Sequence, residues 1–332
     1  MTITIKRGHD MGLKVLFPGA FSTIQDRGRY GYQALGVPVS GAMDMEAFLA
    51  ANSLLGNGKN DAQIEMTLLG GTYTFDTPVS IALTGADMSP KKNGVPIPMW
   101  EAVDVLAGDT VSLGYAADGC RAYLAVAGGF DLPLVMGSRS TNVRCGIGGL
   151  DGRQLRAGDH LDFRTASGKR PGKGEEPMTG DGHMAAGRMA EETAGILAER
   201  STGRLAAQKA ASPRYGSSFS VRAMPGPQDD RFTKAGTDTF FSSVYTMQEG
   251  SDRMGIRLSG EKIESVSGTD ILSDGTVFGS VQITSSGQPI VLMADRQTTG
   301  GYAKIATVLS ADLPKLAQMK PGDTVRFVRA SV

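Results

Sequence analysis

The densest group of side chains that could do chemistry follows the apolar run Ile290–Ala294. Residues 295–302 read Asp-Arg-Gln-Thr-Thr-Gly-Gly-Tyr, and Lys304 comes two residues later. A strand that ends in this segment places an acid, a cation, an amide and hydroxyls at one rim, and its two glycines let backbone N–H groups approach an anion. Such an array suits a small carboxylate or amide, or a phosphorylated intermediate. A polar hairpin with one surface ion pair is the simpler alternative.

Three further clusters combine arginine with acids, hydroxyls or glycine. Residues 25–29 hold two arginines beside Gln, Asp and Gly, which is more than an ordinary turn needs. Residues 137–141 place one arginine among three hydroxyls, an arrangement that resembles an anion cradle. Residues 251–255 contain an Asp-Arg pair, and such neighbours often only form a nearby ion pair. These clusters are candidate anion sites, with structural turns as the alternative.

Other common kinds of site have no support in the sequence. The three histidines, His9, His160 and His183, share no close spacing, so we expect neither a histidine metal site nor a Ser-His-Asp triad. No G-x-S-x-G and no G-x-x-x-x-G-K-[ST] motif occurs. Phosphate, if it binds, would have to use arginine, lysine and glycine-rich turns.

Composition narrows the class of protein. The 34 basic and 34 acidic residues balance, and no basic block occurs, which argues against nucleic acid and anionic membranes as partners. Two cysteines, Cys120 and Cys145, form no disulfide framework, and free thiols fit a reducing cytosol. Neither a signal peptide nor a run of 18 apolar residues is present, so the sequence predicts a cytoplasmic protein without a membrane span.

The elements that must position these clusters are mostly strands. The 45 glycines are about twice the usual share of roughly 7%, which favours many tight turns between short strands. We expect a leader at residues 1–12, a first patterned half at 13–164, a linker at 165–213 that is partly helical or mobile, and a second patterned half at 214–332. The clearest predicted strands are Val79–Thr84, Thr110–Tyr115, Arg121–Val126, His160–Arg164, Phe219–Met224, Ile256–Leu258, Val277–Thr284, Pro289–Ala294, Ala303–Leu309 and Thr324–Val328.

The two halves repeat the same order of signals. Each opens with Pro-Gly followed by Gln-Asp and Arg, each has an apolar strand that runs to a Gly-Gly-aromatic turn, and each closes with Gly-Asp before a final strand. This order favours two similar β-barrels over one mixed domain. Two short helices are expected, Met43–Leu55 and Leu313–Met319, the second with Pro314 in its first turn.

Several long segments resemble one known family. Residues 19–44 (GAFSTIQDRGRYGYQALGVPVSGAMD) and 288–307 (QPIVLMADRQTTGGYAKIAT) carry most of the likeness, with shorter matches at 84–87, 121–129, 137–141, 224–229 and 251–255. The family is variously called the 5-oxoprolinase C subunit, allophanate hydrolase subunit 2 or biotin-dependent carboxyltransferase-like protein. The resemblance implies a mainly β fold of two cyclophilin-like β-barrel domains with a few short helices.

The resemblance also implies a function. The chain is expected to be the C subunit of an ATP-dependent 5-oxoprolinase, a hydrolase that opens 5-oxoproline to glutamate through a phosphorylated lactam. A B-type and an A-type subunit are the implied partners, and ATP is the implied cofactor, bound by this chain or elsewhere in the complex. Cations and backbone N–H groups would stabilise the charge that develops.

The residue roles are a hypothesis within that resemblance. Arg296, Gln297 and Lys304 would bind substrate or phosphate, and Asp295 would orient them. The binding candidates are Asp26, Arg27, Ser138, Arg139, Arg253, Thr298, Gly300 and Tyr302.

Two alternatives stay open. Relatives in this family act as carboxyltransferases that move carboxylate from carboxybiotin to urea; since no biotinyl-lysine motif occurs here, biotin would have to arrive on another chain. A non-catalytic regulator that binds a B-subunit-type partner is the second alternative. Dependence of turnover on this chain would separate the regulator from the two enzymes.

Overall fold

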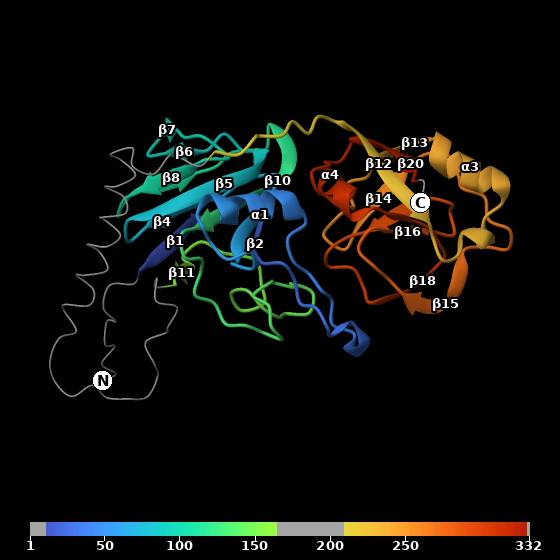
Figure 1. Ribbon diagram of the computed structural model, residues 1–332, viewed down its shortest axis with the longest axis horizontal. Coiled ribbons are helices and arrows are strands. Elements are labelled where there is room, and N and C mark those ends of the chain that lie inside the picture. Colours follow the sequence, from blue (N-terminus) through green and yellow to red (C-terminus); the bar gives the residue numbers. More distant parts are fainter. Residues whose placement is uncertain (1–10, 165–208, 331–332) are drawn as a thin grey trace.

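The computed structural model describes residues 11–164 and 209–330. Most of the predicted leader, residues 1–10, and residues 165–208 of the predicted linker lie outside this range. The described chain is mainly β, as predicted, and its two halves lie side by side (Figure 1). Within the described residues, no helix is long and apolar enough to span a membrane.

The first half consists of two sheets around one apolar core. The first sheet has the order β11 (His160–Asp162), β1 (Gly12–Phe17), β4 (Thr72–Phe75), β9 (Thr110–Ser112), β6 (Lys91–Lys92), β7 (Val95–Pro96). The second has the order β2 (Phe21–Gln25), β3 (Gln63–Thr67), β10 (Asp118–Val126), β5 (Val79–Asp87), β8 (Ala102–Val105). The hydrogen-bonded strands of this half therefore form two sheets rather than one continuous ring.

The helix α1 (Met45–Leu54) explains the long apolar runs of the first half. It packs on β5 and β10, the two nine-residue strands at the centre of the five-stranded sheet. Both strands are buried over nearly their whole length. A strand covered on both faces reads as a continuous apolar run rather than an alternating one, which is the pattern seen here.

The second half is a closed barrel. Its strands follow the order β12 (Ser218–Pro225), β19 (Lys304–Val308), β16 (Ser280–Ile283), β17 (Pro289–Leu292), β14 (Gly255–Ser259), β13 (Val244–Met247), β20 (Thr324–Arg329). Helix α3 (Lys234–Ser242), which the sequence analysis does not predict, lies against β20, where Phe240 stacks on Phe327 with ring centroids 4.5 Å apart. Helix α4 (Leu313–Ala317) lies within the predicted range, with Pro314 in its first turn.

A two-stranded ribbon stands apart from the barrel sheet. It pairs β15 (Asp270–Gly275) with β18 (Thr299–Tyr302) and lies at the lower edge of the second half in Figure 1. The prediction of a Gly-Gly-aromatic turn at residues 300–302 is wrong, because these residues belong to a strand. The reason is that β15 supplies a partner strand that the pattern around 300–302 cannot reveal.

A buried seam joins the two halves. Because the pairing of β10 with β5 shifts register between Asp118 and Ala122, the N–H groups of Cys120 and Arg121 are free for another acceptor. The side-chain oxygen of Gln318, fully buried after α4, accepts both at 2.9 Å. Its amide nitrogen donates to the Arg121 carbonyl at 2.9 Å and to Asp44 at 2.7 Å.

Asp44 sits at this seam and gives it a pH dependence. The carboxylate accepts from the Ala47 N–H at 3.0 Å and so caps α1. Burial raises the pKa of Asp44 to about 6, from the ordinary value of 3.8, although these hydrogen bonds lower it in part. The folded state therefore binds the Asp44 proton more tightly than the unfolded chain does. Protonation of Asp44 thus adds to the free energy of unfolding at low pH, and this contribution is lost as pH rises through about 6.

We predict that the free energy of unfolding of the wild type falls by up to about 3 kcal/mol between about pH 4 and pH 7, measured relative to Asp44→Asn, which cannot ionise. The size follows from the rise of the Asp44 pKa from 3.8 to about 6, since one pKa unit corresponds to about 1.4 kcal/mol. Chemical denaturation of both proteins across this range measures the difference. Parallel pH curves for the two proteins would contradict the prediction.

Candidate functional site

A group of polar side chains closes one end of the second barrel. We call Gln228, Asp274, Gln282, Gln297 and Lys304 the polar barrel end. Lys304 is 2% exposed, and its ammonium donates to Asp274 at 3.0 Å. The Gln228 amide donates to the same carboxylate oxygen at 3.1 Å, while its own oxygen accepts the Lys304 backbone N–H at 3.2 Å. This cluster contains one buried cation and several neutral amides, a set suited to a small anionic or amide ligand.

The two inner glutamines lie beneath the ribbon. Gln282 and Lys304 are paired residues of β16 and β19, so they lie side by side at one level of the barrel. The amide nitrogen of Gln297 is 3.5 Å from the side-chain oxygen of Gln282. Strand β18 passes directly over them, because a Cβ on Gly300 would come within 2.4 Å of the Gln282 amide nitrogen. A side chain at position 300 would therefore have to displace the amide of Gln282.

Asp295 belongs to an ion network at the seam. Arg253 donates to its two carboxylate oxygens at 2.8 and 3.1 Å. The third guanidinium nitrogen of Arg253 donates to Glu65 of the first half. Arg253 also donates to the Gly41 carbonyl at 2.7 Å. Burial lowers the pKa of Arg253, but the neighbouring Asp295 and Glu65 carboxylates outweigh it and raise the pKa. Arg253, an anion-binding candidate, thus already lies between two protein anions.

Two buried guanidinium groups near Asp295 have incomplete hydrogen bonding. Within the described residues, one nitrogen of Arg296 and one of Arg29 find no acceptor, although the two side chains are 6% and 0% exposed. Arg296 lies over the Phe278 ring at 5.9 Å, and Arg29 donates to the carbonyls of Val135 and Ser140. Burial lowers the pKa of both groups. Asp26 is the main charge that opposes this at Arg29, and Tyr30 at Arg296, with Asp295 contributing less to both. Both arginines therefore retain capacity for an anion.

The candidates of the first half organise a loop. Asp26 is fully buried and accepts from the Ser138 hydroxyl at 2.7 Å, the Ser140 hydroxyl at 2.5 Å and the Arg139 backbone N–H at 2.6 Å. The Arg139 guanidinium donates to the Leu132 carbonyl, and Arg27 is exposed. Asp26 and its partners thus fix the shape of residues 132–140.

The structure brings the sequence-predicted residues into three places. Gln297, Gly300, Tyr302 and Lys304 meet at the polar barrel end, with the backbone carbonyl of Thr298 accepting from the Thr276 N–H nearby. Asp295 and Arg253 meet at the seam, and Arg296 follows Asp295 in the sequence. Asp26, Ser138 and Arg139 form the loop of the first half, and Arg27 lies outside it. The N–H of Ser40 donates to the Ala294 carbonyl at 3.1 Å, which links the first half to the start of the 295–304 segment.

Several members of these groups are not among the residues predicted from the sequence. Glu65, Asp274 and Gln282 are absent from those candidates, yet each contacts a predicted residue directly. A signal was present for two of them: Glu65 and Gln282 are polar residues inside short strands whose other residues are mostly buried. No local pattern marks Asp274.

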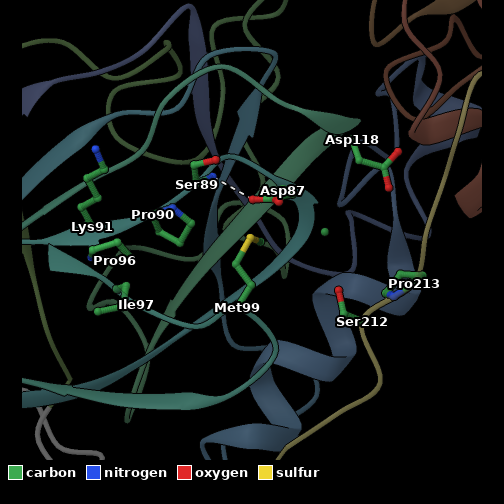
Figure 2. Close-up of a pocket in the computed structure, with 11 residues that line it drawn as sticks. Asp87, Ser89, Pro90, Lys91, Pro96, Ile97, Met99, Asp118, Ser212 and Pro213 are labelled. Atoms are coloured by element: carbon green, nitrogen blue, oxygen red, sulfur yellow. Dashed lines mark hydrogen bonds between the residues drawn. The ribbon is translucent and has the colours of Figure 1, made fainter.

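A separate hollow of about 480 Å³ opens on the first half (Figure 2). Its lining mixes apolar side chains such as Ile97 and Met99 with the carboxylates of Asp87 and Asp118. Both acids hold backbone: Asp87 accepts the Ser89 N–H at 2.8 Å, and Asp118 accepts two backbone N–H groups of the segment that enters the second half, at 2.9 Å each. None of the predicted site residues is among the described residues that line this hollow; most of the predicted residues lie at the polar barrel end, at the seam and in the loop of the first half.

Comparisons with known proteins agree over almost the whole chain. Residues 35–329 match the model of the family described as carboxyltransferase domain, subdomain A and B. The chain is 36% identical over 320 residues to the C subunit of 5-oxoprolinase from Escherichia coli strain K12, covering 96% of this chain and 92% of that protein. It is 35% identical over 311 residues to the same subunit from Haemophilus influenzae, covering 94% and 89% respectively.

A solved structure gives the same fold. The crystal structure of the Kluyveromyces lactis urea amidolyase matches with a TM-score of 0.82 and 29% identity. The match covers 99% of this chain but 19% of that one. The chain therefore spans about a fifth of the length of this structural relative, whereas it corresponds nearly end to end with the two bacterial subunits.

Proposed function

The chain belongs to the carboxyltransferase-domain family with subdomains A and B, and from this we propose that it is the C subunit of an ATP-dependent 5-oxoprolinase complex. The observation that carries the proposal is the match in length. The two bacterial relatives with this name are covered to 92% and 89%, so the likeness is not confined to one module of a larger enzyme. The proposed partners are an A-type and a B-type subunit, and the proposed substrate is 5-oxoproline.

The proposed chemistry overcomes the stability of a lactam. An unstrained cyclic amide is a poor electrophile. In the proposal, the γ-phosphoryl group of ATP moves to the lactam oxygen and ADP leaves. Water then adds to the ring carbon, and the C–N bond breaks with a proton going to nitrogen, which leaves an acyl phosphate. A second water hydrolyses this acyl phosphate, so that phosphate leaves with the former lactam oxygen. Negative charge grows on oxygen in these steps, so positioned cations lower the barrier. The proposal requires ATP in the assembled complex and assigns no nucleotide site to this chain.

The polar barrel end and the adjoining seam supply suitable groups. Lys304 is the buried cation, and the amides of Gln282 and Gln297 are neutral donors that can bind an amide oxygen. Arg296 has an unpartnered nitrogen within the described residues. Asp295, held by Arg253, would orient Arg296 electrostatically. These roles support ring opening of an anionic lactam.

The first test of the proposal is phosphate release by this chain co-purified with its A-type and B-type partners. We expect release that needs ATP, 5-oxoproline and this subunit together, with glutamate formed in equal amount. Omitting this chain while keeping the partners is the control. Release that persists without it would remove the chain from the reaction.

One alternative is supported by a specific observation. The matching family model is a carboxyltransferase domain, and the urea amidolyase structure has the same fold. In that case urea would be the substrate and a biotinylated carrier on another chain would deliver carboxylate. A response to urea plus carrier, with none to 5-oxoproline, would establish this alternative. Tight partner binding without either activity would instead indicate a regulator.

A further inference from the structure

The buried ammonium of Lys304 depends on one carboxylate. Its side chain is 3% exposed, and in the described part of the chain Asp274 is its one ion-pair partner, at 3.0 Å. A buried ammonium without an anion is costly, so a negative group that faces Lys304 stabilises the folded state. Asp274 itself is 53% exposed, so it can leave the contact and remain hydrated. The cation is therefore fixed, and its anion is exchangeable.

The element that carries Asp274 is weakly anchored. Five of the six residues of β15 are exposed, including Leu272 at 94%, and the strand pairs with β18 outside the barrel sheet. Such two-stranded ribbons are marginally stable alone and need outside contacts. The contacts here include the packing of the partly buried Ile271 on the barrel core, the bonds from Lys304 and Gln228 to Asp274, and a 3.4 Å bond from Arg231 to the Asp270 carbonyl. Releasing Asp274 removes the two side-chain bonds to its carboxylate and so weakens this anchor.

The ribbon covers the groups that would meet a ligand. Strand β18 passes over Gln282 and Gln297 through Gly300, and Asp274 pairs with Gly300 across the ribbon. An anionic ligand that reaches Lys304 must therefore take the position of the Asp274 carboxylate. The exchange replaces one anion with another, so it keeps the ammonium neutralised.

We propose that the polar barrel end binds an anionic group of the ligand at Lys304, and that Asp274 is an internal competitor that holds this position until the ligand displaces it. This inference rests on the proposed function and adds the charge class of the substrate. A carboxylate-bearing lactam such as 5-oxoproline can displace Asp274, whereas neutral urea cannot. The anion is the substrate carboxylate or a phosphoryl group, and both share the same chemistry at an ammonium.

Asp274→Asn tests the competitor directly in the reconstituted complex. Its matched control is Asp270→Asn, the same change at an exposed position four residues earlier on β15. We expect the KM for 5-oxoproline to fall about two- to fivefold in Asp274→Asn, the ratio that corresponds to a partly exposed ion pair. The kcat should stay near the wild-type value, and Asp270→Asn should match the wild type in both constants.

Two competitors identify the anion. With 2-pyrrolidinone, the same ring without a carboxylate, the inhibition constant should be equal in wild type and Asp274→Asn. If the group at Lys304 is a phosphoryl rather than the substrate carboxylate, inhibition by inorganic phosphate strengthens in the variant while the KM for 5-oxoproline does not change. A higher KM, lost turnover, or identical behaviour of the two variants would overturn the inference.

Hydrogen exchange of the full chain provides a readout that does not need turnover. Amides of residues 270–275 should exchange faster in Asp274→Asn than in wild type or Asp270→Asn. In wild type, 5-oxoproline or inorganic phosphate should speed the same amides more than chloride at equal ionic strength. A complex without 5-oxoprolinase activity but with this exchange pattern would reject the proposed function and keep the competitor; equal exchange in all three proteins would reject the competitor.

Discussion

Replacing Arg253 with methionine is expected to lower the free energy of unfolding by about 3–5 kcal/mol, the usual cost of removing one partner from a buried ion pair. Arg253 is 6% exposed and lies between Glu65, which is 1% exposed, and Asp295. Methionine fills a similar volume but leaves both carboxylates without their cation. Since Glu65 comes from the first half and Asp295 from the second, the change also weakens the seam.

Equilibrium denaturation of the wild type and the variant measures this loss. Arg257→Met is the matched control, because Arg257 is an exposed arginine on β14 close in sequence to Arg253, and surface changes of this kind usually stay within about 0.5 kcal/mol. Adding Glu65→Gln to Arg253→Met should recover part of the stability by removing one uncompensated charge. Equal losses in the two arginine variants would show that the network does not stabilise the fold.

Replacing Lys304 with methionine is expected to reduce kcat/KM for 5-oxoproline by a factor on the order of 10²–10³, the usual effect of removing one group that stabilises charge in a transition state. The side chain is almost fully buried, so water cannot substitute for the lost ammonium. The fold should survive for two reasons. Methionine is apolar and similar in size to lysine, and the Asp274 carboxylate, which is 53% exposed, stays hydrated after its cation is removed.

Phosphate release by the complete complex measures the effect, and co-purification with the partners confirms assembly. Lys262→Met, an exposed lysine of the same half, is the control and should retain wild-type turnover. Wild-type turnover in Lys304→Met would remove Lys304 from the proposed mechanism. Loss of assembly in Lys304→Met, but not in the control, would assign it a structural role instead.

Much of the fold could be predicted because burial leaves a local pattern. Strands β5 and β10 are covered on both faces and read as apolar runs, and α1 and α4 have the composition of helices. Helix α3 is missed because it buries only Gly236 and Phe240, which gives no apolar stripe. The strands of the first half form two sheets, whereas those of the second form a closed ring. This difference lies in which strands pair, and the periodicity of a sequence does not encode strand pairing.

The candidate site could be predicted only where it is contiguous. Residues 295–304 stand together in sequence, so their chemistry is visible there. Glu65 contacts Arg253 from 188 positions away across the seam, and Asp274 contacts Lys304 from 30 positions away on the ribbon. Spacing also cannot show that the Asp26 carboxylate is already engaged by Ser138 and Ser140. Partners of this kind follow from topology, which only the structure supplies.

The position of Met43 bears on how the molecule is made. This side chain comes from the first half but is 1% exposed within the apolar core of the second barrel. During synthesis it leaves the ribosome long before the strands that will surround it. Likewise, the N–H groups of Cys120 and Arg121 have no Gln318 acceptor until the end of the chain has been made. Each half is thus completed by a side chain of the other: the second half by Met43, and the first by Gln318. Gene fragments divided at the connection would leave the second core without Met43 and two buried N–H groups of the first half without Gln318, so we expect the halves to fold as one unit rather than as two exchangeable modules.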